Sequence, residues 1–304
     1  MSGPTLQESL NTRLALQISL SSLPVVEEWM DADFDRWLES IPLPPELPSG
    51  EAAAFRVSLG SDLSRLTWGA TGHPAGFIPK MSTYFQSLET SGEDIELINQ
   101  VGGTFEPGNV GTWVTADAGA VATGWQFRNE FDLAAIQSLF GDHEGKSRLG
   151  DWAAAHNATR FRRFAQGVGE RPFTEVEVIV PGETVDQQLD AVAAGFRELL
   201  DVDLCDGARR ALGASRPELG LAVRIGRGEI ARVAAVVPGP GLDGVSALCK
   251  DAGLGFDGSL SKIQGALSAE LASFEYARTR AGESQVDVHL AVGAAGDMRK
   301  PGMN

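Results

Sequence analysis

The sequence predicts an α+β fold, an antiparallel barrel of ten strands ringed by helices and built from five hairpin–helix units. Three observations support this fold class. Turn residues recur roughly every 50 to 60 residues, alternating apolar and polar residues flank each turn, and helical patterns separate the hairpins. One hairpin cannot bury its apolar face alone, but five can close into a barrel whose outer face packs against helices.

Five short segments rich in glycine and small residues are the expected hairpin turns. They fall at Gly60-Ser61-Asp62, Ala118-Gly119, residues 167–171, Arg227-Gly228 and Ala281-Gly282. In the first, third, fourth and fifth hairpins one strand face is plainly apolar. The second hairpin, expected around residues 103–105 and 112–128, leaves its register open: either Thr123, Trp125 and Phe127 or Gly124, Gln126 and Arg128 face inward.

Helical patterns follow the hairpins. Thr184-Val185-Asp186-Gln187 is a capping box that opens a strongly amphipathic helix. Other helices are expected at residues 74–89, 131–140, 149–156, 244–252 and 260–271. Residues 1–50 are expected to hold N-terminal helices and a Pro-rich connection, and residues 294–304 a frayed tail, so that residues 1–304 form a single domain.

Composition limits the partners and the compartment. A formal net charge of −16 repels phosphate backbones and anionic lipid, which argues against nucleic acid and membranes. Two cysteines outside any CxxC spacing and the absence of a signal or membrane-span pattern favour the cytoplasm. Scarce lysine with abundant alanine, glycine and arginine is typical of a bacterial chain from a GC-rich genome.

If the apolar strand faces pack on the helices, the opposite faces line the barrel interior. Such an interior must be wet, internally paired or filled by a ligand, because unpaired buried charge is costly. Arg–Glu pairs that hold the barrel together and a ligand site are both open. The histidines lack metal-ligand spacing. The expected interior residues are Arg56, Ser58, Arg65, Thr67, Arg162, Glu175, Glu177, Ala222, Arg224, Arg232, Asp287 and His289.

The five repeats and the polar interior resemble the ABBA prenyltransferases, whose fold is the PT barrel. Within this superfamily the chain looks most like the peptide prenyltransferases of cyanobactin-type pathways. The clearest stretch is LGDWAAAHNATRFRRFAQGVGERPFTEVEVIVPG, residues 149–182. The resemblance implies a lumen that binds an isoprenoid diphosphate with magnesium at one end and an aromatic or peptide acceptor at the other. It also implies a basic cluster, several shielding tyrosines and an acidic residue on the first strand.

The sequence departs from that pattern. The first strand, AAAFRVSLG, has no acidic residue, the chain has only Tyr84 and Tyr276 as tyrosines, and the second hairpin reads AVATGWQF where basic residues are implied. We therefore expect degenerate catalytic residues, no cofactor, and a peptide-binding role in a ribosomal-peptide natural-product pathway. The partners would be a precursor peptide or small aromatic ligand and other pathway enzymes.

Two alternatives stay open. One is an active prenyltransferase acting on a peptide or small aromatic acceptor; the other is a different enzyme using His289 with Asp287 or Glu177 as acid–base groups. The candidate ligand-binding residues are Arg56, Arg65, Trp125, Arg162, Glu175, Glu177, Arg224, Arg232, Tyr276, Asp287 and His289.

Overall fold

A computed structural model describes residues 54–88, 92, 95–99, 109–117, 120–137, 143–169, 172–214, 218–239, 241–266 and 269–292. The predicted N-terminal helices, the Pro-rich connection, residues 103–105 and the tail after residue 293 lie outside these ranges. The extent of the single domain therefore stays a prediction. None of the helices within the described ranges combines the length and apolar character needed to cross a bilayer.

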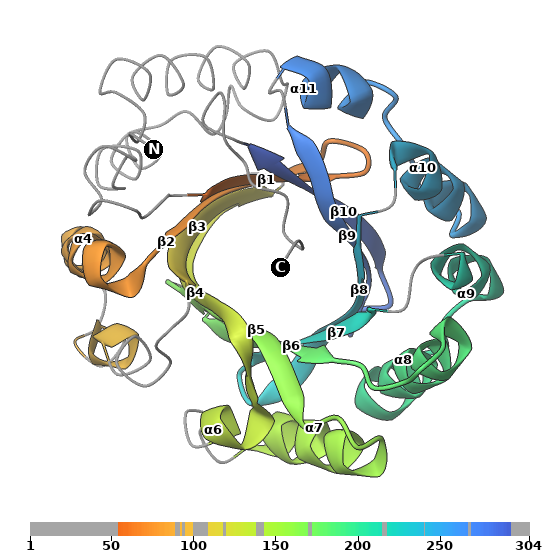
Figure 1. Cartoon of the computed structure of the whole chain (residues 1–304), viewed down its shortest axis with the longest axis horizontal. Coiled ribbons are helices and arrows are strands. Elements are labelled where there is room, and N and C mark those ends of the chain that lie inside the picture. The colour runs from red at the N-terminus through yellow and green to blue at the C-terminus, as the bar shows by residue number, and fades with distance from the viewer. Residues whose placement is uncertain are drawn as a thin grey trace.

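Ten antiparallel strands close into a barrel, which confirms the predicted fold class. Each strand pairs with its neighbours in sequence, and β1 pairs with β10 to complete the ring. Figure 1 shows the strands enclosing the centre, with the helices outside them. The strands are β1 (Ala54–Gly60), β2 (Arg65–Gly72), β3 (Asn109–Asp117), β4 (Ala120–Asp132), β5 (Arg160–Val168), β6 (Phe173–Ile179), β7 (Gly220–Gly226), β8 (Glu229–Pro238), β9 (Glu270–Thr279) and β10 (Ser284–Val292).

The turns after β1, β7 and β9 lie where the sequence predicts them, whereas Ala118-Gly119 and residues 170–171 lie outside the described ranges. Between β7 and β8, Arg227 and Gly228 both have positive φ, at 52° and 81°. A two-residue turn of that kind matches the right-handed twist of the strands it joins. The turn after β1 is closed by a hydrogen bond of 2.9 Å from the Leu63 amide to the Gly60 carbonyl.

Helices follow the hairpins and cover the outside of the barrel (Figure 1). The predicted capping box at Thr184 is present, with the Thr184 hydroxyl accepting from the Gln187 amide. Two predictions need correction, because Phe131 and Leu271, expected in helices, lie in strands β4 and β9. The helices are α4 (Pro74–Ser87), α6 (Leu133–Gln137), α7 (Glu144–Ala155), α8 (Val185–Leu200), α9 (Asp206–Gly213), α10 (Leu242–Asp251) and α11 (Leu260–Ala266).

The main hydrophobic core fills the layer between the barrel wall and the helices. Strand residues such as Trp68, Phe164 and Val176 point outward into it and meet helix residues such as Phe85 and Phe196. Their burial removes apolar surface from water, which is the largest favourable term in folding. With the apolar faces committed to the helices, the opposite face of every strand looks into the barrel.

Candidate functional site in the barrel interior

Charged side chains from nine strands meet inside the barrel and form what we call the interior charge cluster. It contains seven arginines and four carboxylates, which leaves three positive charges in excess while His289 is neutral. This surplus contrasts with the net charge of −16 on the whole chain. The members are Arg56, Arg65, Arg128, Arg162, Arg163, Arg224, Arg232, Glu175, Glu177, Glu275 and Asp287.

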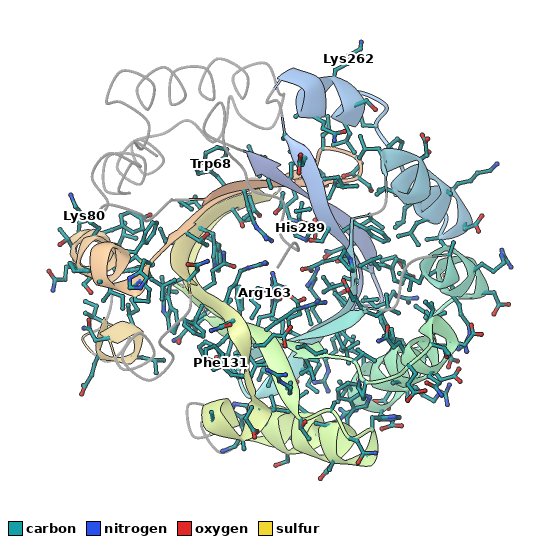
Figure 2. All side chains as sticks on the ribbon, in the orientation of Figure 1. Trp68, Lys80, Phe131, Arg163, Lys262 and His289 are labelled. Atoms are coloured by element: carbon teal, nitrogen blue, oxygen red, sulfur yellow. The ribbon has the colours of Figure 1, made fainter. Side chains whose placement is uncertain are left out.

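The centre of the cluster is a continuous set of ion pairs. Arg163 Nη2 lies 2.8 Å from Glu275 Oε1 and 3.0 Å from Glu175 Oε1. Arg232 Nη2 lies 2.7 Å from Glu275 Oε2 and 3.2 Å from Asp287 Oδ2. Figure 2 shows Arg163 reaching from the wall toward the centre of the barrel. The Arg–Glu pairs that the sequence left open are therefore present. Some of them join neighbouring strands, while Arg163–Glu275 joins strands that do not neighbour each other.

Further arginines extend the network around its edge. Arg65 pairs with Asp287, and its Nε donates to Asp287 Oδ1 at 2.9 Å. Arg162 pairs with Glu177, and Arg224 Nε lies 2.8 Å from Glu175 Oε2.

The pKa values of the central groups reflect this pairing. Burial alone would raise the pKa of Glu275, but Arg163 and Arg232 outweigh it and hold that pKa well below its usual range. The pKa values of Glu175 and Glu177 are lowered in the same way by their arginines. The central carboxylates are thus firmly ionised at neutral pH, and each has its charge compensated.

Arg56 and Arg128 differ from the other arginines. No carboxylate within the described ranges lies at ion-pair distance from either, and the Nε atom of Arg128 is buried without a hydrogen-bond partner there. Burial, with the charges of Arg56 and Arg163, holds the pKa of Arg128 well below its usual range. Burial also lowers the pKa of Arg56, where Arg163 opposes the compensation from Glu177. These two guanidinium groups would be stabilised by an added anion.

An aromatic pair lies on the interior wall beside the charges. Trp113 on β3 and Phe173 on β6 stack with ring centroids 5.7 Å apart and planes 20° apart. Between their strands, the register places Gly124 and Gly167 in the same row, and a Cβ at either position would overlap one of the rings. Arg224 Cζ lies 4.0 Å from the Phe173 ring centroid. Because these two glycines have no side chain, the rings of Trp113 and Phe173 can stack beside the Arg224 guanidinium. This arrangement suits the stacking of a planar ligand.

The structure settles the register of the second hairpin. The Thr123 hydroxyl contacts Tyr84 on α4, while Trp125 packs on Phe164 in the outer core. The Thr123, Trp125 and Phe127 face is therefore outside, and Gly124, Gln126 and Arg128 look inward. Arg128 follows AVATGWQF directly, so this hairpin does bring a basic residue inside.

Most of the predicted site residues lie in the interior, with two exceptions. Trp125 faces the helices, and so does Tyr276, which packs on Phe196 of α8 at a centroid distance of 6.1 Å. Their placement does not suit contact with an interior ligand. The remaining candidates, which the structure brings together inside the barrel, are Arg56, Arg65, Arg162, Glu175, Glu177, Arg224, Arg232, Asp287 and His289.

Sequence reasoning missed several interior residues: Trp113, Arg163, Phe173 and Glu275. Arg163 was hidden by a bulge in β5, where the register shifts between Phe161 and Arg163 and places two successive arginines near Glu177. Glu275 alternates with Phe274 and Tyr276, so its inward direction could have been read from the pattern.

Solved structures of known proteins share the fold. No family model matches the chain. The 5-dimethylallyltryptophan synthase of Streptomyces coelicolor superposes with a TM-score of 0.59 at 11% identity, covering 98% of this chain and all of that one. AnaPT of Neosartorya fischeri gives 0.58 at 11% identity, with 97% of each chain covered. The apo form of the prenyltransferase PriB gives 0.63 at 13% identity, covering 96% of this chain and 97% of that one.

One curated relative matches in sequence, a PH domain-containing protein of Dictyostelium discoideum. It is 27% identical over 222 residues, which cover 70% of this chain and 48% of the relative. The chain thus spans about half the length of that protein. At these identities the solved structures establish the PT-barrel fold, while function has to be argued from the interior.

Proposed function

We propose that the protein binds an isoprenoid diphosphate inside the barrel and transfers the prenyl group to an aromatic acceptor. The observation that carries this proposal is that, among the described residues, Arg56 and Arg128 have no carboxylate at ion-pair distance, within a cluster that holds three more cations than anions. A diphosphate supplies the missing negative charge. When the bond to the prenyl group breaks, the leaving diphosphate gains charge, and fixed guanidinium groups stabilise it most at that moment.

The aromatic pair supports the transfer of the prenyl group to an acceptor. Trp113 and Phe173 offer π faces to an allylic cation or to a planar acceptor. Proteins of the same fold have been described with such ligands: PriB is recorded with diphosphate, and with L-tryptophan and dimethylallyl thiolodiphosphate. Magnesium would enter bound to the diphosphate, since every described interior carboxylate is already paired with arginine.

A second candidate is a barrel that holds a peptide without prenyl transfer, as part of a ribosomal-peptide pathway. The observation that favours it is the mixed charge of the interior, where carboxylates such as Glu175 and Glu275 already bind arginines and would oppose a diphosphate. In that case Arg56 and Arg128 would bind the terminal carboxylate of the peptide.

The decisive assay incubates the protein with dimethylallyl diphosphate, magnesium and a panel of indoles, tryptophan and peptides, and reads product masses. An enzyme-dependent gain of one prenyl mass supports transfer. Diphosphate binding without product overturns transfer, and tighter binding of peptides with a free C-terminus than of their amidated forms then favours the second candidate. Failure of dimethylallyl diphosphate, inorganic diphosphate and peptides to bind would overturn both.

Matched variants separate the site from the surface. Arg128→Gln should weaken diphosphate binding, whereas Arg160→Gln on β5 should not, because Arg160 is exposed and pairs with Glu130 outside the cluster.

A further inference from the structure

Three neighbouring strands, β1, β10 and β9, place Ser58, His289 and Glu275 in a row, so that His289 lies between the other two. Ser58 Oγ is 2.6 Å from His289 Nδ1, and His289 Nε2 is 3.3 Å from Glu275 Oε1. The β1–β10 register places Ser58 directly opposite His289, so the hydrogen bond is fixed by strand pairing. Both residues face the interior and are half-buried, and Figure 2 shows His289 pointing inward.

The charge of Glu275 determines which nitrogen of His289 carries the proton. Its carboxylate is held ionised by Arg163 and Arg232, so it can only accept a proton or hydrogen bond. When His289 is neutral, its single ring proton is therefore favoured on Nε2, facing Glu275. The lone pair on Nδ1 then accepts from the Ser58 hydroxyl, which leaves the Ser58 oxygen lone pairs free toward the interior.

We propose that Ser58, His289 and Glu275 form a proton relay that removes the proton from the aromatic acceptor during prenyl transfer. This inference rests on the proposed function. Transfer breaks the bond between the prenyl carbon and the diphosphate oxygen and forms a carbon–carbon bond to the acceptor ring. The C–H bond at that ring carbon then breaks, its electrons restore aromaticity, and its proton goes to Ser58 Oγ. The original hydroxyl proton of Ser58 moves to His289 Nδ1 in the same step.

The surroundings suit that step. The imidazolium formed at His289 has the Glu275 carboxylate beside Nε2, and His289 later returns its proton to water. The other charged groups around this part of the interior are Arg163 and Arg232, which hold Glu275, and Asp287 with its partner Arg65. Ser58 lies two residues from Arg56 on the same strand face, so the base is close to the proposed anion site without being part of it.

The test uses Ser58→Ala and His289→Gln, with Thr67→Val as the matched control. Thr67 is the residue paired with Ser58 on β2, and its hydroxyl contacts Thr115 instead of the relay. We expect both relay variants to lose about 100-fold or more in kcat, the usual contribution of general-base catalysis, while KM and diphosphate affinity stay within a few-fold. The pH dependence of kcat should differ from that of the wild type in both variants and match it in the control.

The outcomes separate this relay from the proposed function. If the wild-type protein makes prenylated product and the two relay variants keep its rate and pH profile, the relay is overturned and prenyl transfer stands. If the wild type makes no product, prenyl transfer is overturned, and with it the relay's role in that reaction.

Nitrogen-15 NMR of the histidine side chains judges the relay without turnover. If His289 carries its proton on Nε2 near neutral pH in the wild type, and Ser58→Ala shows a mixture of the two tautomers, the proposed direction of the hydrogen bonds is supported. Protonation at Nδ1, or an imidazolium in the resting protein, overturns it.

Discussion

Arg163 and Glu275 meet 2.8 Å apart although their strands, β5 and β9, are separated by three others in the barrel wall. The contact therefore crosses the interior and does not follow the sheet. Because the Glu275 carboxylate also binds Arg232 and lies beside His289, one side chain fixes several groups around it. Both the stability of the barrel and the geometry of the candidate site depend on this carboxylate.

Replacing Glu275 with Gln should destabilise the protein by about 3–5 kcal/mol, the cost of leaving buried charges without their partner. Urea denaturation followed by circular dichroism measures the change. Glu270→Gln at the exposed start of β9 is the control and should change the free energy of unfolding by less than about 0.5 kcal/mol. Equal, small effects of the two substitutions would show that the central network does not stabilise the barrel.

Acid should weaken the barrel in a defined direction. The folded-state pKa values of Glu175, Glu177 and Glu275 are all lowered, so these groups stabilise the fold above their unfolded pKa, near 4.3, and lose that effect as pH falls further. Urea midpoints measured at successive pH values should fall steeply below about pH 4.5. The fall should be shallower in Glu275→Gln; an identical slope in both proteins would contradict the assignment.

Arg128 and Arg163 are register partners on β4 and β5, yet they should respond oppositely to substitution. Arg163→Gln removes the partner of three carboxylates and should destabilise the protein by about 3–5 kcal/mol. Arg128→Gln removes a buried charge whose desolvation outweighs its attraction to Glu177, and it should leave stability unchanged or raise it. Calorimetry with inorganic diphosphate should show a loss of about tenfold or more for Arg128→Gln, equivalent to one charge-assisted hydrogen bond. Unaltered affinity would exclude Arg128 from the anion site.

Gly167→Ala should disturb the aromatic pair, because the new methyl group would overlap the Phe173 ring and force it off Trp113. We expect weaker binding of aromatic acceptors, unchanged binding of inorganic diphosphate, and a stability loss of about 1–3 kcal/mol. Gly226→Ala is the control, since Gly226 pairs with Phe173 on the other side and its Cβ would meet the nearest atom only at 3.8 Å. Acceptor binding that survives Gly167→Ala would argue against stacking on this pair.

The sequence predicted the barrel because hairpin turns and strand alternation are local signals. The inward direction of Arg65 and Glu175 follows from the alternation of side chains along β2 and β6, which no register shift interrupts between the turn and either residue. The alternation of inward and outward side chains did not predict the inward direction of Arg163. A bulge shifts the register there, and no residue type marks a bulge reliably.

The aromatic pair could not be predicted for a different reason. Trp113 and Phe173 meet only because Gly124 and Gly167 fall in one row across four strands, and row alignment depends on the stagger of the closed barrel. Tyr276 was one of the candidate ligand-binding residues, yet it faces the helices. Its position two residues after Phe274, on the apolar face of β9, indicated this outward direction.

The closure of the barrel between β1 and β10 has a consequence for folding. Ser58 and His289 meet across 231 residues of chain, so one side of β1 stays an open edge until β10 has been synthesised and docks. Open strand edges recruit other chains, and contacts this distant in sequence form slowly. The interval between translation of β1 and arrival of β10 is therefore when this protein is most prone to aggregate, and chaperones that shield strand edges should increase its yield most strongly in that interval.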